Sequence, residues 1–216
     1  MPRRGARGRA AAAGRRPGRH RPGDQRPPGP RLSVGRLFLG VAPPAAAVAA
    51  LVAAVDRVRD DPGAPRWSAP TDLHVTLAFL GDVPRAGLSG LLPALGPAVA
   101  GSPPVTLQLT GAGRFGSRRP RVLWAGVGGD VDALTVLADR LAAAARHAGV
   151  PVDERPFRPH LTLGRWPGAG TPDAALVDRL AGDHGPAWPV TEVVLWRSPP
   201  GRPYERVTGW PSPHQA

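Results

Sequence analysis

The chain has 216 residues and a formal net charge of +12, from 28 basic and 16 acidic residues. That length allows one large domain or two small lobes with a substantial core. It has no cysteine, which excludes disulfides and thiolate chemistry, and no apolar run long enough for a transmembrane helix. We therefore expect a cytoplasmic protein without a membrane segment.

The positive charge is concentrated at the N-terminus. Residues 1–31 hold ten of the arginines and a single acid, Asp24, and they show no hydrophobic periodicity. Such a segment buries too little apolar surface to offset its ordering entropy, so we predict a disordered extension over 1–33. It is either an arm that attracts RNA or an inert extension. We place the folded domain at 34–211 and a short tail at 212–216.

Hydrophobic periodicity predicts alternating strands and helices in the folded part. The predicted strands cover residues 36–42, 73–81, 105–109, 121–127, 159–165, 190–196 and 204–210. The predicted helices cover roughly 44–59, 85–100, 132–148 and 172–182. We expect Pro93 and Pro97 to interrupt the second helix, and the stretches 66–70 and 111–120 to be loops. This order is typical of an α+β protein.

Two of these strands carry the same short motif. Residues 73–81 read LHVTLAFLG and residues 159–165 read PHLTLGR, so His-x-Thr-x occurs at His74 and Thr76 and again at His160 and Thr162. Because side chains two apart on a strand share a face, each copy presents an imidazole beside a hydroxyl. The repeat suggests a duplicated, two-lobed protein in which the two pairs face each other across a cleft.

Two opposed histidines suit phosphodiester cleavage. One imidazole takes a proton from the nucleophile while the other gives a proton to the leaving oxygen, and the usual imidazole pKa makes both roles available near neutral pH. The threonine hydroxyls donate to the phosphate oxygens as charge builds there. No metal or other cofactor is required, and the remaining histidines lack the spacing of a zinc site.

With these residues the sequence resembles the 2H phosphoesterases, and most closely their RNA 2′,3′-cyclic phosphodiesterase branch, also called 2′-5′ RNA ligase. The resemblance covers about residues 35–211. It includes the segments RLFLGVAPP, LHVTLAFLGDVP, RFGSRRPRVLWAGV, RPFRPHLTLGR and SPPGRPYERV.

The resemblance implies a bilobal fold with an antiparallel sheet and flanking helices in each lobe, and an active-site cleft between the lobes. It implies hydrolysis of a terminal RNA 2′,3′-cyclic phosphate to a 2′-phosphate, with 2′-5′ ligation as a lesser reverse activity. By position, His74 matches the general acid and His160 the general base, while Thr76 and Thr162 match residues that hold the phosphate.

Two further positions lie five residues after each histidine. Strict alternation places Phe79 and Arg165 on the face opposite the histidines, so we expect Phe79 to lie in the core. Arg165 reaches the phosphate only if its strand bulges or ends there. Four arginines are candidates to line the cleft and attract the RNA backbone: Arg118, Arg119, Arg121 and Arg158. Trp67, Phe157 and Tyr204 are candidates to stack on a terminal base, and core packing is an equal alternative for Phe157.

Two rival interpretations remain open from the sequence. The first is a 2H phosphoesterase that acts on another substrate, such as a small cyclic phosphate or a 2′-5′ oligonucleotide. The second is an RNA-binding protein with a silent site, in which the arginine-rich extension binds the RNA. We favour an enzyme that acts on RNA ends as a monomer, since a duplicated chain builds both halves of the site itself.

Overall fold

A computed structural model of the chain describes residues 33–116, 122–166 and 174–213. All of the described residues belong to one compact unit. The strands are β1 (Ser33–Val41), β2 (Arg66–Trp67), β3 (Val75–Pro84), β4 (Thr106–Phe115), β5 (Val122–Gly129), β6 (His160–Arg165), β7 (His184–Pro189), β8 (Glu192–Ser198) and β9 (Glu205–Pro211). The helices are α1 (Ala45–Asp56), α2 (Arg85–Ala100), α3 (Val131–His147) and α4 (Ala174–Ala181).

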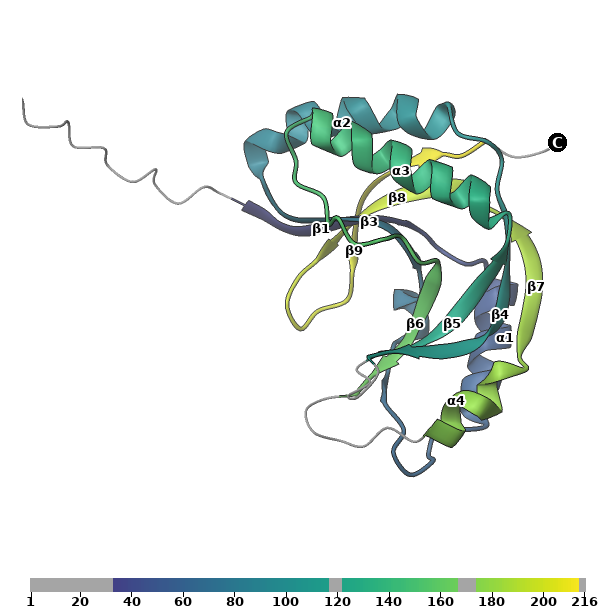
Figure 1. Cartoon of the computed structure of the whole chain (residues 1–216). Coiled ribbons are helices and arrows are strands. Elements are labelled where there is room, and N and C mark those ends of the chain that lie inside the picture. The colour runs from purple at the N-terminus through teal and green to yellow at the C-terminus, as the bar shows by residue number, and fades with distance from the viewer. Residues whose placement is uncertain (1–32, 117–121, 167–173, 214–216) are drawn as a thin grey trace, which may run out of the picture. The chain divides into compact units, whose positions relative to one another are not determined.

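The strands form one curled antiparallel sheet in the order β7-β4-β5-β6-β3-β1-β8-β9, with the short β2 paired to β6 (Figure 1). The sheet has two portions of four strands. We call β3, β1, β8 and β9 the β1 side, and β6, β5, β4 and β7 the β5 side. The only register pair between β3 and β6 in the described chain is Val75 with Leu161, so the two sides meet at a narrow junction. The predicted α+β class is confirmed.

The connections cross from one side of the sheet to the other. Helix α1 leaves β1 yet packs against β7 on the β5 side, whereas α3 leaves β5 and packs with α2 and β3 on the β1 side. Figure 1 shows α2 and α3 running together over the β1 side. The segments β1-α1-β3 and β5-α3-β6 therefore follow the same path in opposite halves, which is the arrangement expected of a duplicated fold.

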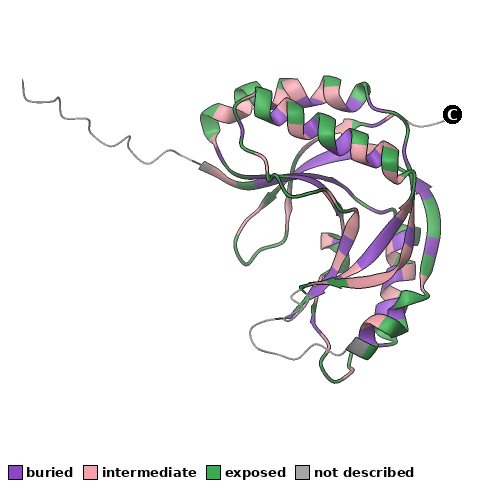
Figure 2. Ribbon diagram, in the orientation of Figure 1, coloured by how far each residue is buried: buried purple, intermediate pink, exposed green. Residues whose placement is uncertain are grey.

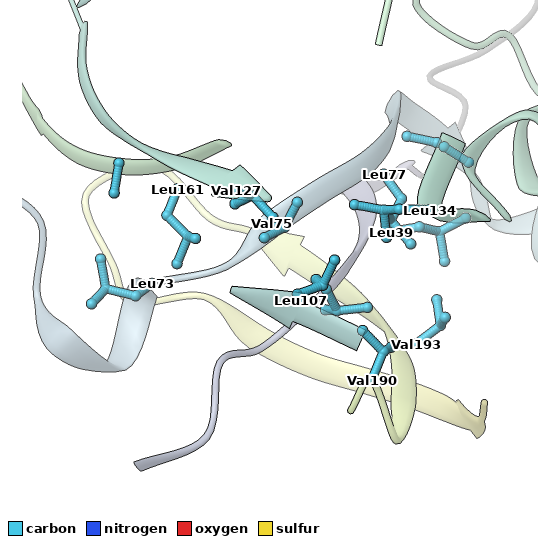
Figure 3. Packing of buried hydrophobic residues seen from close by; sticks show 14 of the residues in the cluster. Leu39, Leu73, Val75, Leu77, Leu107, Val127, Leu134, Leu161, Val190 and Val193 are labelled. Carbon is cyan, nitrogen blue, oxygen red and sulfur yellow. The ribbon is translucent and has the colours of Figure 1, made fainter. Parts of the chain in front are cut away.

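One continuous apolar core joins the two sides. Val75 and Leu161 at the junction are both fully buried, and Figure 3 places them in the same cluster as Leu39, Leu77 and Leu107. Buried residues follow the inner faces of the strands and helices, while the exposed residues gather on the outer helix faces (Figure 2). The site described below lies on the sheet face that this core leaves free.

Two predictions about single elements were wrong. Helix α2 runs without a break through Pro93 and Pro97, because its apolar stripe of Leu91, Leu95 and Val99 is completely buried and outweighs the lost backbone bonds. Strand β4 continues to Phe115 in what we expected to be a loop. Residues 117–120 of the predicted loop lie outside the described residues.

The sequence also gave no sign of two short strands. Strand β7 contains Pro186 and Pro189, which are tolerated because β7 is an edge strand. Strand β2 has only two residues, too few for a periodic pattern. None of the helices in the described chain is both long and apolar enough to span a membrane.

Candidate active site

The two His-x-Thr motifs meet where β3 and β6 join. His74 directly precedes β3 and His160 begins β6. Val75 lies opposite Leu161 in antiparallel register, so the strand directions place His74 across from Thr162 and Thr76 across from His160. Because Val75 and Leu161 point into the core, the four polar side chains share the other face. They form a two-by-two array with an approximate two-fold symmetry.

Each imidazole is held by the same local hydrogen bond. The Nδ1 atom of His74 lies 2.7 Å from the carbonyl oxygen of Asp72, and that of His160 lies 2.6 Å from the carbonyl oxygen of Arg158. A carbonyl oxygen only accepts, so Nδ1 carries the proton in both rings. In the neutral imidazoles Nε2 is therefore the proton acceptor and remains available for a substrate.

Aromatic rings support each imidazole. The His74 ring lies 4.6 Å from that of Phe38, and it also contacts Trp196 and Tyr204. His160 meets the ring of Phe115 edge-on at 4.8 Å and lies 6.5 Å from Trp124. These contacts fix the ring planes and remove water from around the imidazoles.

Both histidines have a pKa below the usual value of 6.5. Burial is the main cause for each, and it outweighs the backbone hydrogen bond, which acts in the opposite direction. The positive charge of Arg165 lowers the pKa of both rings further, and the charge of His160 adds to this effect at His74. Both imidazoles are thus neutral at pH 7 in the free protein, and the two rings lie close enough for their charges to interact.

Arg165 reaches this face because β6 bulges. Trp124 of β5 pairs with Thr162 and Leu123 pairs with Gly164, so Leu163 is an extra residue that shifts the alternation by one. Arg165 is exposed and lies on the same face as His160 and Thr162. From the sequence, Arg165 could lie on the face of the histidines only if β6 bulged or ended there, and the structure contains this bulge.

Strand β3 has the matching irregularity, which makes the prediction for Phe79 wrong. Gly40 of β1 pairs with Thr76 and Leu39 pairs with Ala78, so Leu77 is the extra residue. Phe79 consequently lies on the face of His74 and is 47% exposed, whereas we expected it in the core. It occupies the position on β3 that Arg165 occupies on β6.

Of the other residues singled out from the sequence, two lie next to the histidines and two pack against the core. Tyr204 contacts the His74 ring, and Arg158 is exposed next to His160. Trp67 and Phe157 pack partly buried against the core, and the Trp67 Nε1 donates to the carbonyl oxygen of Arg59. The remaining three arginines, Arg118, Arg119 and Arg121, lie outside the described residues.

Sequence reasoning missed several neighbours of the site. Phe38 and Trp196 contact His74 but lie on strands that were predicted only from their apolar pattern, and Phe115, which contacts His160, was assigned to a loop. Arg66 was assigned to a loop. Across the described ranges, no three His, Cys, Asp or Glu side chains gather in a way that could hold a metal ion.

The fold and the paired motifs have clear relatives. Residues 42–202 match the model of the 2'-5' RNA ligase superfamily. The RNA 2',3'-cyclic phosphodiesterase of Thermus thermophilus is 33% identical over 205 residues, which cover 81% of this chain and 99% of that protein. The protein of the same name from Geobacillus stearothermophilus is 36% identical over 149 residues, 67% of this chain and 47% of that protein.

Several of these alignments are partial. The regions matched in the first four curated relatives span about half the length of each, as for the Escherichia coli RNA 2',3'-cyclic phosphodiesterase, which is 39% identical over 104 residues, 48% of this chain and 57% of that protein. The match to the Thermus thermophilus protein, in contrast, extends over nearly the whole of that protein.

Solved structures agree with the fold. TT0787 of Thermus thermophilus has a TM-score of 0.68 at 29% identity and covers 84% of this chain and all of that one. Escherichia coli LigT in complex with 3'-AMP has a TM-score of 0.65 at 30% identity and covers 82% of this chain and 98% of LigT. The chain therefore belongs to the 2'-5' RNA ligase superfamily, and the resemblance identified from its two His-x-Thr motifs is confirmed.

Proposed function

We propose that this chain hydrolyses the 2′,3′-cyclic phosphate at the end of an RNA to a 2′-phosphate without a metal ion. The observation that carries the proposal is the two-by-two array of His74, Thr76, His160 and Thr162 around a symmetric junction. The names of the relatives support the same reaction. A solved relative in complex with 3'-AMP supports a nucleotide as the ligand.

In this proposal the two free Nε2 atoms carry the proton transfers. The Nε2 of His160 takes a proton from water, and the water oxygen attacks phosphorus. The bond from phosphorus to the 3′ oxygen breaks, and the Nε2 of His74 gives its proton to that oxygen. His74 must be protonated for this step, and the negative charge of the bound phosphate favours that form by raising the His74 pKa.

Thr76, Thr162 and Arg165 hold the phosphate in the proposed complex. Both hydroxyls lie on the face of the histidines and donate to non-bridging oxygens as charge builds in the transition state. Arg165 supplies a positive charge, and its influence on the pKa of both imidazoles supports a position near the reacting group. If the 5′-hydroxyl of a second RNA replaces water, the same transfers form a 2′-5′ bond.

Residues from a single chain complete the proposed site, so we propose that the protein acts as a monomer. Its substrates are RNA or oligonucleotide ends, and we propose the cytoplasm as its place of action. We also propose that residues 34–211 are sufficient for the activity, with 1–33 and 212–216 outside the catalytic domain.

The test is hydrolysis of a short RNA ending in a 2′,3′-cyclic phosphate, with EDTA present. We expect wild type to give a 2′-phosphate, and His74→Ala and His160→Ala each to lower kcat about 10²- to 10⁴-fold, the usual contribution of a general acid or base. His184→Ala is the matched control, because the Nδ1 of His184 makes the same contact with the carbonyl oxygen of residue i−2, Gly182, but the residue is exposed on β7.

The result also separates the rival interpretations. Turnover that is indifferent to both histidines contradicts the catalytic proposal. Binding of the RNA without turnover by the wild type favours a silent RNA-binding protein. Efficient hydrolysis of small cyclic phosphates with none of RNA ends points to another substrate.

A further inference from the structure

Strand β2 places a second arginine beside Arg165. Arg66 pairs directly with Arg165 in the antiparallel register of β2 and β6, and Val122 of β5 pairs with Arg165 from the other side. Directly opposite residues in an antiparallel pair project to the same face, with Cβ atoms about 5 Å apart. The Arg66 and Arg165 side chains therefore leave the sheet side by side, on the face that carries the histidines.

The neighbouring residue on β2 confirms which face this is. Trp67 pairs with Gly164 and packs partly buried against the core. Because alternate residues of a strand face opposite ways, Arg66 points away from the core and is exposed. The two arginines lie at the end of the row formed by His160, Thr162 and Arg165 along β6.

Gly164 allows β2 to come this close. A Cβ atom at Gly164 would lie 2.8 Å from the Pro65 side chain and 2.9 Å from the carbonyl oxygen of Arg66. A side chain at this position would push β2 away from β6. Because Gly164 has no side chain, the backbone of Arg66 can lie against the strand that carries Arg165.

This pairing has an electrostatic cost that the described residues do not offset. Like charges directly opposite on a sheet destabilise it. Neither Arg66 nor Arg165 forms an ion pair with a carboxylate in the described part of the chain, although six other arginines there do. Two adjacent exposed guanidinium groups without an acidic partner are complementary to a ligand with two anionic groups.

We infer that Arg66 forms a second phosphate subsite, which binds the phosphate on the 5′ side of the nucleotide whose cyclic phosphate reacts beside Arg165. The inference rests on the proposed function and adds to it that the site recognises a nucleotide within a chain rather than a free cyclic mononucleotide. Two phosphates one nucleotide apart match two long side chains that start on neighbouring strands. Arg66 is a binding residue in this arrangement and takes no part in proton transfer.

The test compares two substrates that differ in one group. Adenosine 2′,3′-cyclic phosphate is assayed with and without a 5′-phosphate, on wild type and on Arg66→Ala. We expect the wild type to have a lower KM for the 5′-phosphorylated substrate. In Arg66→Ala we expect the KM for the 5′-phosphorylated substrate to rise about 5- to 20-fold, as for loss of one charge-assisted hydrogen bond. The KM for the substrate without a 5′-phosphate, and kcat for both substrates, should stay within about two-fold of wild type.

A second measurement uses an RNA octanucleotide ending in a cyclic phosphate. The slope of log(kcat/KM) against log salt should become less negative by about 0.7 in Arg66→Ala, the change expected for one lost phosphate contact on a single strand. Arg66→Lys should keep most of the slope, because it keeps the charge. Arg85→Ala is the matched control, since Arg85 is exposed at the start of α2, beyond the far end of β3, and should change neither quantity.

The outcomes separate this inference from the proposed function. If Arg66→Ala raises KM equally for both mononucleotides, or for neither, the second subsite is overturned while the hydrolytic activity stands. If wild type hydrolyses none of the substrates, the proposed function is overturned and the inference with it. A selective effect on the 5′-phosphorylated substrate and on the salt slope supports the subsite.

Discussion

At the scale of single residues, the two histidines of the site share one chemical state. Each donates its Nδ1 proton to a carbonyl oxygen two residues earlier, and each has a lowered pKa because its ring is buried among aromatic side chains. Two equal neutral imidazoles cannot divide the acid and base roles by themselves. In the proposed mechanism the bound phosphate makes the difference, by favouring the protonated form of His74.

The charge of Arg165 lowers the pKa of both histidines, which leads to a prediction for the pH dependence of the reaction. The pH profile of kcat/KM reports the pKa values of the free enzyme. Because both imidazole pKa values lie below 6.5, we expect the maximum of kcat/KM for the wild type below pH 6.5. Arg165→Gln removes a positive charge that disfavours both imidazolium forms, so both pKa values rise and the maximum moves to higher pH.

The measurement is kcat/KM against pH for wild type and Arg165→Gln on an RNA end with a cyclic phosphate. The control is Arg158→Gln, because Arg158 is exposed nearby but contributes no resolved charge effect to either histidine. A shift of the Arg165→Gln maximum toward lower pH would contradict the electrostatic argument.

At the scale of single elements, the two bulges decide which side chains reach the site. Leu77 on β3 and Leu163 on β6 are each an extra residue, three places after the histidine, and each reverses the alternation that follows. Without these bulges Phe79 and Arg165 would both point into the core. The same kind of bulge thus brings an aromatic side chain, Phe79, to the site face on β3 and a cationic one, Arg165, to the site face on β6.

The exposure of Phe79 predicts a contrast in stability. Phe79→Ala should change the free energy of unfolding by less than about 1 kcal/mol, because the ring is half exposed. Phe38→Ala should cost about 3 to 5 kcal/mol, because Phe38 is 4% exposed and contacts four other rings. Urea unfolding of both variants measures the difference, and similar losses would mean that Phe79 is core after all.

Two glycines on strands next to the site lie against backbone of neighbouring strands. A Cβ atom on Gly40 would lie 2.5 Å from the carbonyl oxygen of Val75, and one on Gly126 would lie 2.2 Å from that of Thr110. Gly40 pairs with Thr76 and Gly126 pairs with His160. A glycine therefore lies beside a site residue on each side of the junction, the one on β1 next to Thr76 and the one on β5 next to His160.

We predict that Gly40→Ala destabilises the protein by about 1 to 3 kcal/mol, because the added methyl group meets backbone that cannot move cheaply. Gly182→Ala is a control, since nothing lies within 4 Å of a Cβ atom there. Denaturant midpoints of the two variants give the comparison, and an equal effect at both glycines would refute the steric explanation.

At the scale of the whole molecule, the two sides of the sheet depend on each other. Helix α1 covers the β5 side although it follows β1, and α3 covers the β1 side although it follows β5. Strands β8 and β9 return from the C-terminal end to extend the β1 side. The strands of the β1 side come from both ends of the described chain, and each side is covered by a helix that follows a strand of the other, so we do not expect either half of the chain to fold alone.

Removal of residues 1–33 tests the proposed domain boundary. All described residues lie in one compact unit. We expect a chain starting at residue 34 to keep the thermal midpoint of the full chain within about 2 °C and to hydrolyse cyclic mononucleotides with an unchanged KM. Thermal unfolding and steady-state kinetics check this.

The same truncation separates the two interpretations of the extension. If it is an RNA-attracting arm, its loss weakens binding of longer RNA and lowers the salt dependence, because several arginine contacts to phosphate disappear. If it is inert, both quantities stay the same. Loss of turnover on small substrates would instead place part of residues 1–33 in the catalytic domain.

The sequence by itself determined the strands and helices with a clear hydrophobic period. It also determined that the histidine and the threonine of each motif lie side by side. Alternation identified both His-x-Thr strands and put each histidine beside its threonine, because those relations depend only on the local geometry of a strand. The repeat also indicated two equivalent halves. Together with the flanking segments, the motifs were specific enough to indicate the family.

Tertiary structure decided what the local pattern could not express. A bulge arises where two strands settle their register, so the exposed positions of Phe79 and Arg165 depended on pairing with β1 and β5. Strand β2 exists only because Gly164 leaves room for it, and it alone brings Arg66 beside Arg165. The pKa of each histidine likewise follows from rings and charges that are distant in sequence, because burial and Coulomb interactions depend on spatial proximity.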